Sequence, residues 1–151
     1  MPHEGMVHAL EETHRILRPT GYLIEIHPAR EVPFVLVRSD GKISFAEADP
    51  GYDYEEDLEQ AERAVTVAVD RGMFVLERTR RFELRTHASS VKELRDHFAV
   101  TGAYDPEEKD ETLLRFRDAM YERAQAALDE PAVSQELIYV EPARMSRLTP
   151  T

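Results

Sequence analysis

The sequence contains no cysteine among its 151 residues. Disulfide bonds and thiolate metal sites are therefore excluded, and the cytoplasm is the default compartment for such a chain. No apolar run approaches the ~20 residues that a membrane-spanning helix needs. The segment Met1–Ala9 lacks the apolar core of a secretory signal peptide. We therefore expect a cytoplasmic protein that does not have a membrane as its partner.

Basic residues are also scarce, since 19 lysines and arginines stand against 30 aspartates and glutamates, which gives a net charge of −11. This charge disfavours nucleic acid as a partner, because binding to a phosphate backbone needs a basic surface. The charge is uneven, with seven carboxylates and no base in Asp49–Glu62 and five arginines against two glutamates in Arg71–Arg85. A solvated acidic helix beside a basic strand explains this pattern without any functional role.

Common nucleotide-binding and hydrolase motifs are absent. The sequence has no G-x-G-x-x-G, no G-x-x-x-x-G-K and no G-x-S-x-G. The segment Glu11–His14 has the E-x-x-H spacing of a carboxylate metal site, but such a site needs a second matching helix. No second E-x-x-H helix is present, so we expect a solvated helix face and no metal. The sequence identifies no catalytic residue.

What the sequence does contain is an ordered series of helix and strand patterns. Apolar spacing predicts a helix over Glu4–Arg18, which Pro19 and Gly21 end before a short apolar strand, Tyr22–His27. Asp40-Gly41 between two extended runs predicts a β-hairpin. Further helices are predicted from Asp53 to Gly72, Ser90 to Phe98 and Asp105 to Pro131, and further strands over Phe74–His87 and Gln135–Leu148. These patterns favour an α/β fold in a single domain, residues 1–151.

Two of these elements have a predicted core face. The long helix repeats apolar residues at Leu113, Phe116, Met120, Ala124 and Ala127. The strand Phe74–His87 places Phe74, Leu76, Phe82 and Leu84 on one side. Arg78 and Arg80 interrupt that side, so we expect a bulge or a solvent-exposed middle in this strand.

His27 is the histidine with the most informative position, at the carboxyl end of the first apolar strand. Ligands of open α/β sheets bind outside the carboxyl ends of strands. His27 therefore either contacts a ligand or forms a hydrogen bond to a neighbouring loop. Glu25 lies inside the same strand, where a carboxylate needs a partner or a water-facing edge, and Arg30 is the candidate partner.

The segment "ALEETHRILRPTGYLIEIHP" (Ala9–Pro28) resembles a signature of class I S-adenosylmethionine-dependent methyltransferases. In that family the helix after the fourth strand ends in a segment like E-x-x-R-V-L-K-P-G-G, and the fifth strand follows at once. The matching residues are Glu12, Arg15, Ile16, Leu17, Arg18, Pro19 and Gly21, and Thr20 replaces the first glycine. A helix that stops sharply and feeds a strand within a few residues needs proline and glycine, so the physical requirement agrees with the pattern.

The resemblance implies a partial Rossmann-like methyltransferase sheet, with strands five to seven, a β-hairpin and packing helices. Tyr22–His27 would be the fifth strand, Phe74–His87 the sixth and Gln135–Leu148 the seventh, with the last two antiparallel. Strands one to four have no counterpart, and neither do the glycine-rich turn and the acidic residue that grip the cofactor. S-adenosylmethionine is therefore implied as the cofactor of the parent family, but we do not expect this chain alone to bind it. No cofactor-binding residue is assigned.

The resemblance also implies a substrate side and a partner. The family builds its substrate side largely from segments after the fourth and fifth strands, which points to a small-molecule substrate and to His3, His27 and Arg30 as substrate-binding residues. The methyl acceptor is not identified. Without a fourth strand beside it, Tyr22–His27 has an open edge, and we expect a homodimer through that strand.

Three explanations for half a fold remain open. The chain is a truncated methyltransferase, a genuine half-domain with another use, or an unrelated α+β domain that resembles the signature by accident. The first explanation makes it a methyltransferase fragment that is inactive alone. The others make it a non-enzymatic dimerisation or interaction module, or a small α+β ligand-binding domain with a cavity under its long helix.

Overall fold

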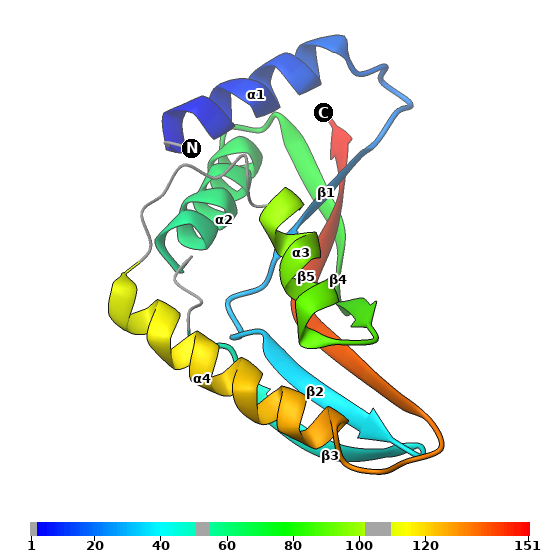
Figure 1. Ribbon diagram of the computed structural model, residues 1–151. Coiled ribbons are helices and arrows are strands. Elements are labelled where there is room, and N and C mark those ends of the chain that lie inside the picture. Colours follow the sequence, from blue (N-terminus) through cyan, green and yellow to red (C-terminus); the bar gives the residue numbers. More distant parts are fainter. Residues whose placement is uncertain (1–2, 51–54, 102–109) are drawn as a thin grey trace. The chain divides into compact units, whose positions relative to one another are not determined.

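Helices and strands follow one another as the sequence patterns predict in the computed structural model, which describes residues 3–50, 55–101 and 110–151 (Figure 1). The helices are α1 (His3–Ile16), α2 (Glu55–Asp70), α3 (Val91–Thr101) and α4 (Glu111–Leu128). The strands are β1 (Leu23–Pro28), β2 (Phe34–Ser39), β3 (Lys42–Ala48), β4 (Phe74–Ala88) and β5 (Gln135–Pro150). The predicted α/β class is confirmed.

The five strands form one antiparallel sheet that is organised around β5. The second half of β5 pairs with β1, its first half pairs with β2, and β3 extends the sheet beyond β2. β4 also pairs with β5, and side-chain contacts of Glu77 with Arg147 and of His87 with Glu136 show that these two strands run in opposite directions. A Rossmann-like sheet is mostly parallel. The antiparallel sheet observed here therefore does not support the predicted Rossmann-like methyltransferase sheet.

The chain divides into two compact units. The first contains Met1–Glu31, Tyr54–Phe82 and Pro142–Thr151, and the second contains Val32–Asp53 and Glu83–Glu141. By residue number, β4 and β5 each contribute to both units. The single domain over residues 1–151 stays a prediction.

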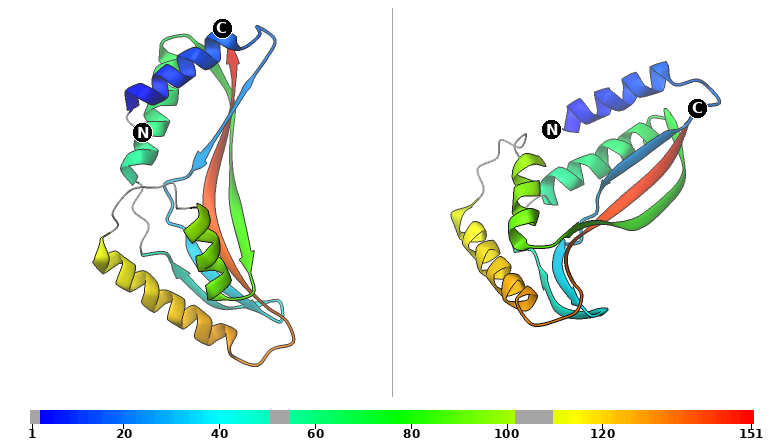
Figure 2. Two further views of the ribbon diagram at one scale, coloured as in Figure 1. Left: turned by 45° about the horizontal axis from the view of Figure 1, so that its top comes forward. Right: turned by 45° about the vertical axis from the view of Figure 1, so that its right-hand side comes forward.

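In the first unit, α1 and α2 lie on the same face of the strands β1, β5 and β4 (Figure 2). Their shared core contains Ala68, Phe74 and Leu148, with Leu10, Leu17, Leu23, Val65, Val69 and Met73 packed around them. Burial alternates along β1, so that His27 is buried while Ile24 and Ile26 are exposed. One face of β1 is therefore covered and the other meets solvent.

In the second unit, the β2–β3 hairpin and β5 pack against α3 and α4. Asp40 and Gly41 have φ values of 50° and 77°, as a two-residue hairpin turn with two left-handed residues requires. The predicted hairpin is therefore confirmed. The core contains Val35, Val37, Ala88, Val91, Leu94, Met120, Tyr121, Ala124, Leu128, Leu137 and Tyr139.

The inward stripe of α4 differs from the predicted one. Phe116 is 58% exposed, and the helix buries Met120, Tyr121, Ala124 and Leu128. Tyr121 and Leu128 each follow a predicted position, Met120 and Ala127, by one residue, so the buried face of the helix extends further round than predicted. Asp110 is the N-cap of α4, and its carboxylate accepts the N–H of Thr112 at 2.6 Å. The start signals predicted at Asp53 and at Asp105 lie outside the described residues.

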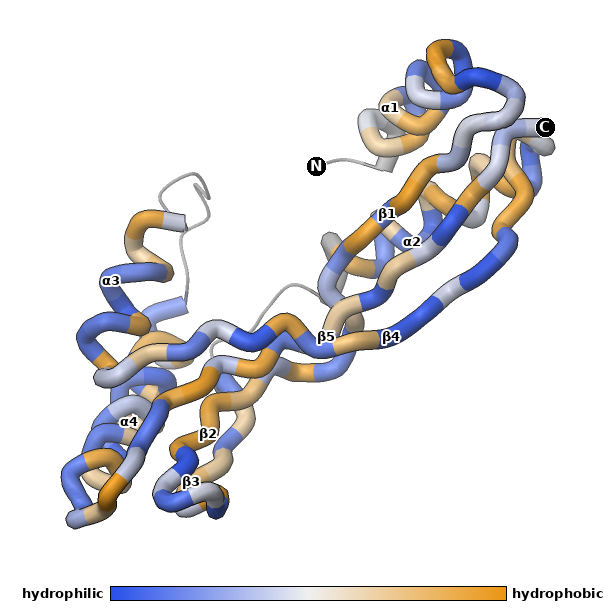
Figure 3. Tube along the Cα trace, turned by 90° about the vertical axis from the view of Figure 1, so that its right-hand side faces the viewer, coloured by the Kyte–Doolittle hydropathy of each residue, from blue (hydrophilic) through white to orange (hydrophobic). Residues whose placement is uncertain are grey.

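β4 has the exposed middle that its charges predict. Figure 3 shows a hydrophilic run along the middle of this strand. Phe74 is buried, but Leu76 and Leu84 are 39% and 46% exposed, so the predicted apolar face is wrong at these two positions. The charged residues between Leu76 and Leu84 keep this part of the strand in solvent, although apolar and polar residues alternate along it.

The turn between α1 and β1 requires glycine for a reason of space. Among the described glycines only Gly41 and Gly72 have positive φ, so Gly21 is not in a left-handed conformation. A Cβ atom at Gly21 would instead lie 3.0 Å from the carbonyl oxygen of Arg18 and 3.0 Å from Cδ1 of Leu17. The N–H of Gly21 also donates to the same Arg18 carbonyl at 2.7 Å, which closes the turn.

We predict that Gly21→Val destabilises the protein and that Thr20→Gly does not. The valine side chain overpacks against the Arg18 carbonyl, at an expected cost of about 1–3 kcal/mol, whereas Thr20 is exposed. Urea unfolding followed by circular dichroism measures both variants. Equal midpoints for Gly21→Val and the parent would contradict the tight turn.

Candidate functional site

A polar cavity of about 240 Å³ lies in the first unit, between α2 and the strands β1, β4 and β5. Its lining residues are Glu25, His27, Glu62, Val65, Thr66, Val69, Asp70, Leu76, Arg144 and Ser146. Both charged and apolar side chains therefore face the same space. This combination is typical of small-molecule sites, in which a few polar groups fix the orientation of the ligand.

The strand side of the cavity is a block of four polar residues on β1 and β5. Glu25 is paired in register with Ser146, and His27 is paired with Arg144. His27 and Ser146 are only 8% and 1% exposed. Since side chains alternate along a strand, the register that buries Leu23 in the core also turns Glu25 and His27 inward.

The helix side of the cavity is a polar stripe on α2. Glu62, Thr66 and Asp70 are spaced by four residues, which places them on one face of the helix. The carboxylate of Glu62 accepts from Nη1 of Arg144 at 3.2 Å and contacts Nη2 of Arg30 at 3.1 Å. Glu62 is therefore balanced by two guanidinium groups.

Three buried polar atoms of this site have no hydrogen-bond partner in the described part of the chain: Oε2 of Glu25, Nε2 of His27 and Nε of Arg144. The other ring nitrogen of His27, Nδ1, is bonded to Oε1 of Glu25. Nε2 of His27 lies 3.9 Å from Oε1 of Glu62, which is too far for a hydrogen bond. Nearly all buried polar atoms in proteins form hydrogen bonds. Three buried atoms without a hydrogen-bond partner around one cavity therefore indicate that the cavity binds a polar ligand.

Among the side chains that the structure describes, no group of three or more histidine, aspartate or glutamate residues is placed to hold a metal ion. The predicted E-x-x-H face is also occupied by protein contacts, since Glu11 pairs with Arg71 at 2.8 Å and His14 packs edge-on against Phe74. The cavity is suited to recognise a small organic molecule by charge and hydrogen bonding.

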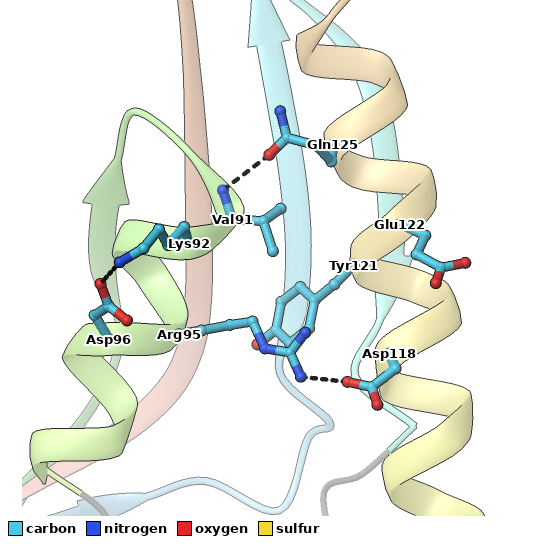
Figure 4. A pocket seen from close by; sticks show the side chains of 8 residues that line it. All are labelled: Val91, Lys92, Arg95, Asp96, Asp118, Tyr121, Glu122 and Gln125. Atoms are coloured by element: carbon cyan, nitrogen blue, oxygen red, sulfur yellow. Dashed lines mark hydrogen bonds and ion pairs between the residues drawn. The ribbon is translucent and has the colours of Figure 1, made fainter.

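A second pocket, of about 550 Å³, lies in the second unit between α3 and α4 (Figure 4). Four of its five charged side chains form ion pairs, because Arg95 contacts Asp118 and Lys92 contacts Asp96, and the fifth is Glu122. Gln125 accepts the N–H of Val91 at 3.2 Å. The four paired charged side chains are more than half exposed, so this pocket is the weaker candidate for a site.

The second unit also buries a hydrogen-bonded carboxylate, Asp49, which is 2% exposed. Its two oxygens accept from Nε of Arg117 at 2.9 Å and from the hydroxyl of Tyr139 at 3.0 Å. Burial and the charge of Asp49 raise the pKa of Tyr139, and burial raises the pKa of Tyr121 to about 12. Since both carboxylate oxygens are bonded within the chain, the network has a structural role.

The structure brings together two of the three residues predicted to bind substrate. His27 lines the cavity, and Arg30 contacts Glu62, which also lines it. The partner of Glu25 is His27, so the predicted Glu25–Arg30 pair is wrong. His3 is the first residue of α1, and its side chain lies outside the described residues.

Sequence reasoning missed Glu62, Arg144 and Ser146. Glu62 belongs to the acidic run Asp49–Glu62, for which the sequence predicts a solvent-exposed helix face. Arg144 and Ser146 alternate along β5 with the same period as Glu25 and His27 along β1. That alternation was visible in the sequence, but only the pairing register places the four residues side by side.

We predict an alkaline loss of stability that involves Tyr121. Because the folded state raises the pKa of this buried tyrosine from 10.0 to about 12, it keeps the proton longer than the unfolded chain. Stability is therefore complete below pH ~10 and falls as the pH rises towards 12, by roughly 1.4 kcal/mol per pH unit. Urea unfolding between pH 9 and 11.5 should show a shallower decline for Tyr121→Phe than for the parent. Identical declines would contradict the buried position of the hydroxyl.

Neither a search for membrane-spanning helices nor a comparison with known proteins assigns a function to the chain. None of the described helices combines the length and the apolar character that crossing a membrane requires. Comparison of the chain with protein-family models, with curated proteins and with solved structures found no match. Any proposal about function therefore depends on the residues and on the geometry of this chain.

Proposed function

We propose that this chain is the C-terminal half of a class I S-adenosylmethionine-dependent methyltransferase that acts on a small molecule in the cytoplasm. The observation that carries the proposal is the position of β5 between β1 and β4. The resemblance implies the same arrangement, because its seventh strand lies beside the fifth and pairs antiparallel with the sixth. The order of β1, β5 and β4 supports the proposal, whereas the antiparallel character of the whole sheet does not.

The segment between α1 and β1 supports the proposal independently. α1 ends at Ile16 and β1 begins at Leu23, so the signature lies at a real helix-to-strand reversal. Gly21, which matches the signature, is the position where a side chain has no room. Thr20, which departs from it, is exposed and free to vary.

The proposed division of labour follows from the chemistry of methyl transfer. Displacement at a sulfonium methyl group needs the two reactants to be held in line, and positioning alone provides most of the acceleration. A cofactor-binding half would supply S-adenosylmethionine, and this chain would supply residues of the substrate side. His27, within the cavity, and Arg30, bound to Glu62, are the candidates, together with His3.

The coding sequence upstream of Met1 tests the proposal most directly. An in-frame segment with a predicted strand followed by G-x-G-x-G would support it, because these elements grip the cofactor in the family that the chain resembles. An upstream region without an open reading frame would leave the half-fold without its partner and would contradict the truncated enzyme.

We predict that the 151-residue chain alone does not bind S-adenosylmethionine with micromolar affinity. The physical reason is the absence from the sequence of the glycine-rich turn that carries the cofactor. Titration calorimetry measures this, with a complete class I methyltransferase as the positive control. Micromolar binding to this chain would contradict the half-domain.

A non-enzymatic interaction module is the second candidate function, and the outer face of β1 favours it. On β1, Ile24 and Ile26 are 40% and 53% exposed, and Tyr22, the residue before the strand, is 55% exposed. The described ladders pair β1 with β5 on one edge only. An apolar strand with a free edge is a template for pairing with a second copy of the chain, and a two-fold dimer satisfies both free edges at once.

We predict that the chain forms a homodimer through β1 and that the double variant Ile24→Lys, Ile26→Lys weakens it. Two charges on the strand make burial in an interface costly. The matched control is Val133→Lys, because Val133 is 98% exposed and belongs to the second unit. Light scattering after size exclusion measures the mass. A monodisperse parent near 17.4 kDa at high protein concentration would contradict the open edge.

A further inference from the structure

The polar cavity of the first unit identifies a class of ligand, independently of whether the chain is half of a methyltransferase. Its volume is about 240 Å³. A water molecule occupies about 30 Å³ in the liquid, so the cavity has the volume of roughly eight waters. It therefore has room for a small organic molecule of a few heavy atoms.

The charge around the cavity is negative. Glu25, Glu62 and Asp70 line it, whereas its cationic neighbours are Arg144 and, through its contact with Glu62, Arg30. Three carboxylates against two guanidinium groups leave one negative charge when His27 is uncharged. Both guanidinium groups bind Glu62, so Glu25 and Asp70 have no guanidinium partner, and of these two carboxylates Glu25 is the less exposed. A cation of one positive charge would complement it.

The unmet hydrogen-bonding atoms define the ligand further. When Nδ1 of His27 carries the proton and donates it to Glu25, Nε2 is an acceptor. Nε2 of His27 and Oε2 of Glu25 are then two buried acceptors without a donor. A protonated primary amine has three N–H donors and one positive charge, and it satisfies both atoms at once.

The opposite requirement comes from Arg144. Its Nε–H is buried and has no acceptor in the described part of the chain. A hydroxyl oxygen on the ligand would accept this N–H, while Val65, Val69 and Leu76 provide an apolar wall for a short carbon linker. A carboxylate would also accept from Arg144, but it would cancel the positive charge that the site needs.

We propose that this cavity binds a small amino alcohol, with its ammonium group at Glu25 and His27 and its hydroxyl at Arg144. His27 is more than nine-tenths buried, and its unpartnered Nε2 belongs to a side chain that lines the cavity. The ligand provides the cation for the buried Oε2 of Glu25 and the acceptor for the buried Nε–H of Arg144.

The test is a titration of the ¹⁵N-labelled full chain with 2-aminoethanol, followed through amide chemical shifts. Saturable shifts are expected in β1, α2 and residues 144–146. Ethylamine, which lacks the hydroxyl, ethylene glycol, which lacks the ammonium group, and glycine, which carries a carboxylate, should each bind at least about tenfold more weakly, because each loses a charge-assisted or charge-balancing contact.

Variants locate the binding. Glu25→Gln and Arg144→Met should each weaken binding of 2-aminoethanol by about tenfold or more, since each removes a charged partner. Glu59→Gln is the matched control, because Glu59 lies on the same helix α2, pairs with Arg63 at 2.8 Å and is exposed. It should leave the affinity unchanged. If Glu25→Gln loses its folded amide spectrum, Glu25→Asp, which keeps the charge but withdraws the carboxylate from the cavity, takes its place and should also weaken binding.

Three results would overturn the proposal. One is the absence of saturable, localised shifts with 2-aminoethanol at millimolar concentration, which would mean that only water fills the cavity. Another is equal affinity for glycine, which would exclude the amino alcohol class. The third is an unchanged affinity in both Arg144→Met and the carboxylate variant. All three are measured without S-adenosylmethionine, so none of them bears on the methyltransferase proposal.

Discussion

A buried strand must satisfy the hydrogen-bonding groups of its backbone on both edges, and the rest of this structure depends on how β5 meets that constraint. β1 and β2 pair with successive halves of β5, and β4 pairs with it as well. Four consecutive residues, Leu137–Val140, are buried, so both faces of β5 are covered in the second unit. Each of the two units therefore contains a part of the same strand.

The register of β5 explains why polar residues lie inside the first unit. Pairing that places Leu148 opposite Leu23 in the core also places Ser146 opposite Glu25 and Arg144 opposite His27 on the same face. A shift of one residue would expose these polar groups and would also expose the core leucines. Burying charged groups with unmet atoms costs stability. A ligand that satisfies those atoms would offset the cost, which is why the cavity is the most informative feature for function.

The sequence predicted what depends on neighbouring residues. The order of the helices and strands, the Asp40-Gly41 hairpin and the reversal before β1 follow from apolar spacing, glycine and proline, all of which act over a few residues. The start of α4, at Glu111, was not predicted. It did not predict what depends on register and layers. Glu62 and Arg144 are 82 residues apart in the sequence. They meet only because α2 packs over the face of β5 on which Arg144 lies. Asp49, which follows β3, reaches Tyr139 on β5, 90 residues away, because β2 pairs with both of these strands.

Amide hydrogen exchange measured residue by residue at low protein concentration tests the central position of β5 most directly. The account predicts that the amides of β5 paired with β1 and β2 are among the slowest to exchange. Along β1 it predicts alternation, with slow amides facing β5 and fast amides facing the free edge, because an edge strand bonds through every second N–H. Uniformly slow exchange along β1, or rapid exchange across residues 143–148 of β5, would contradict it.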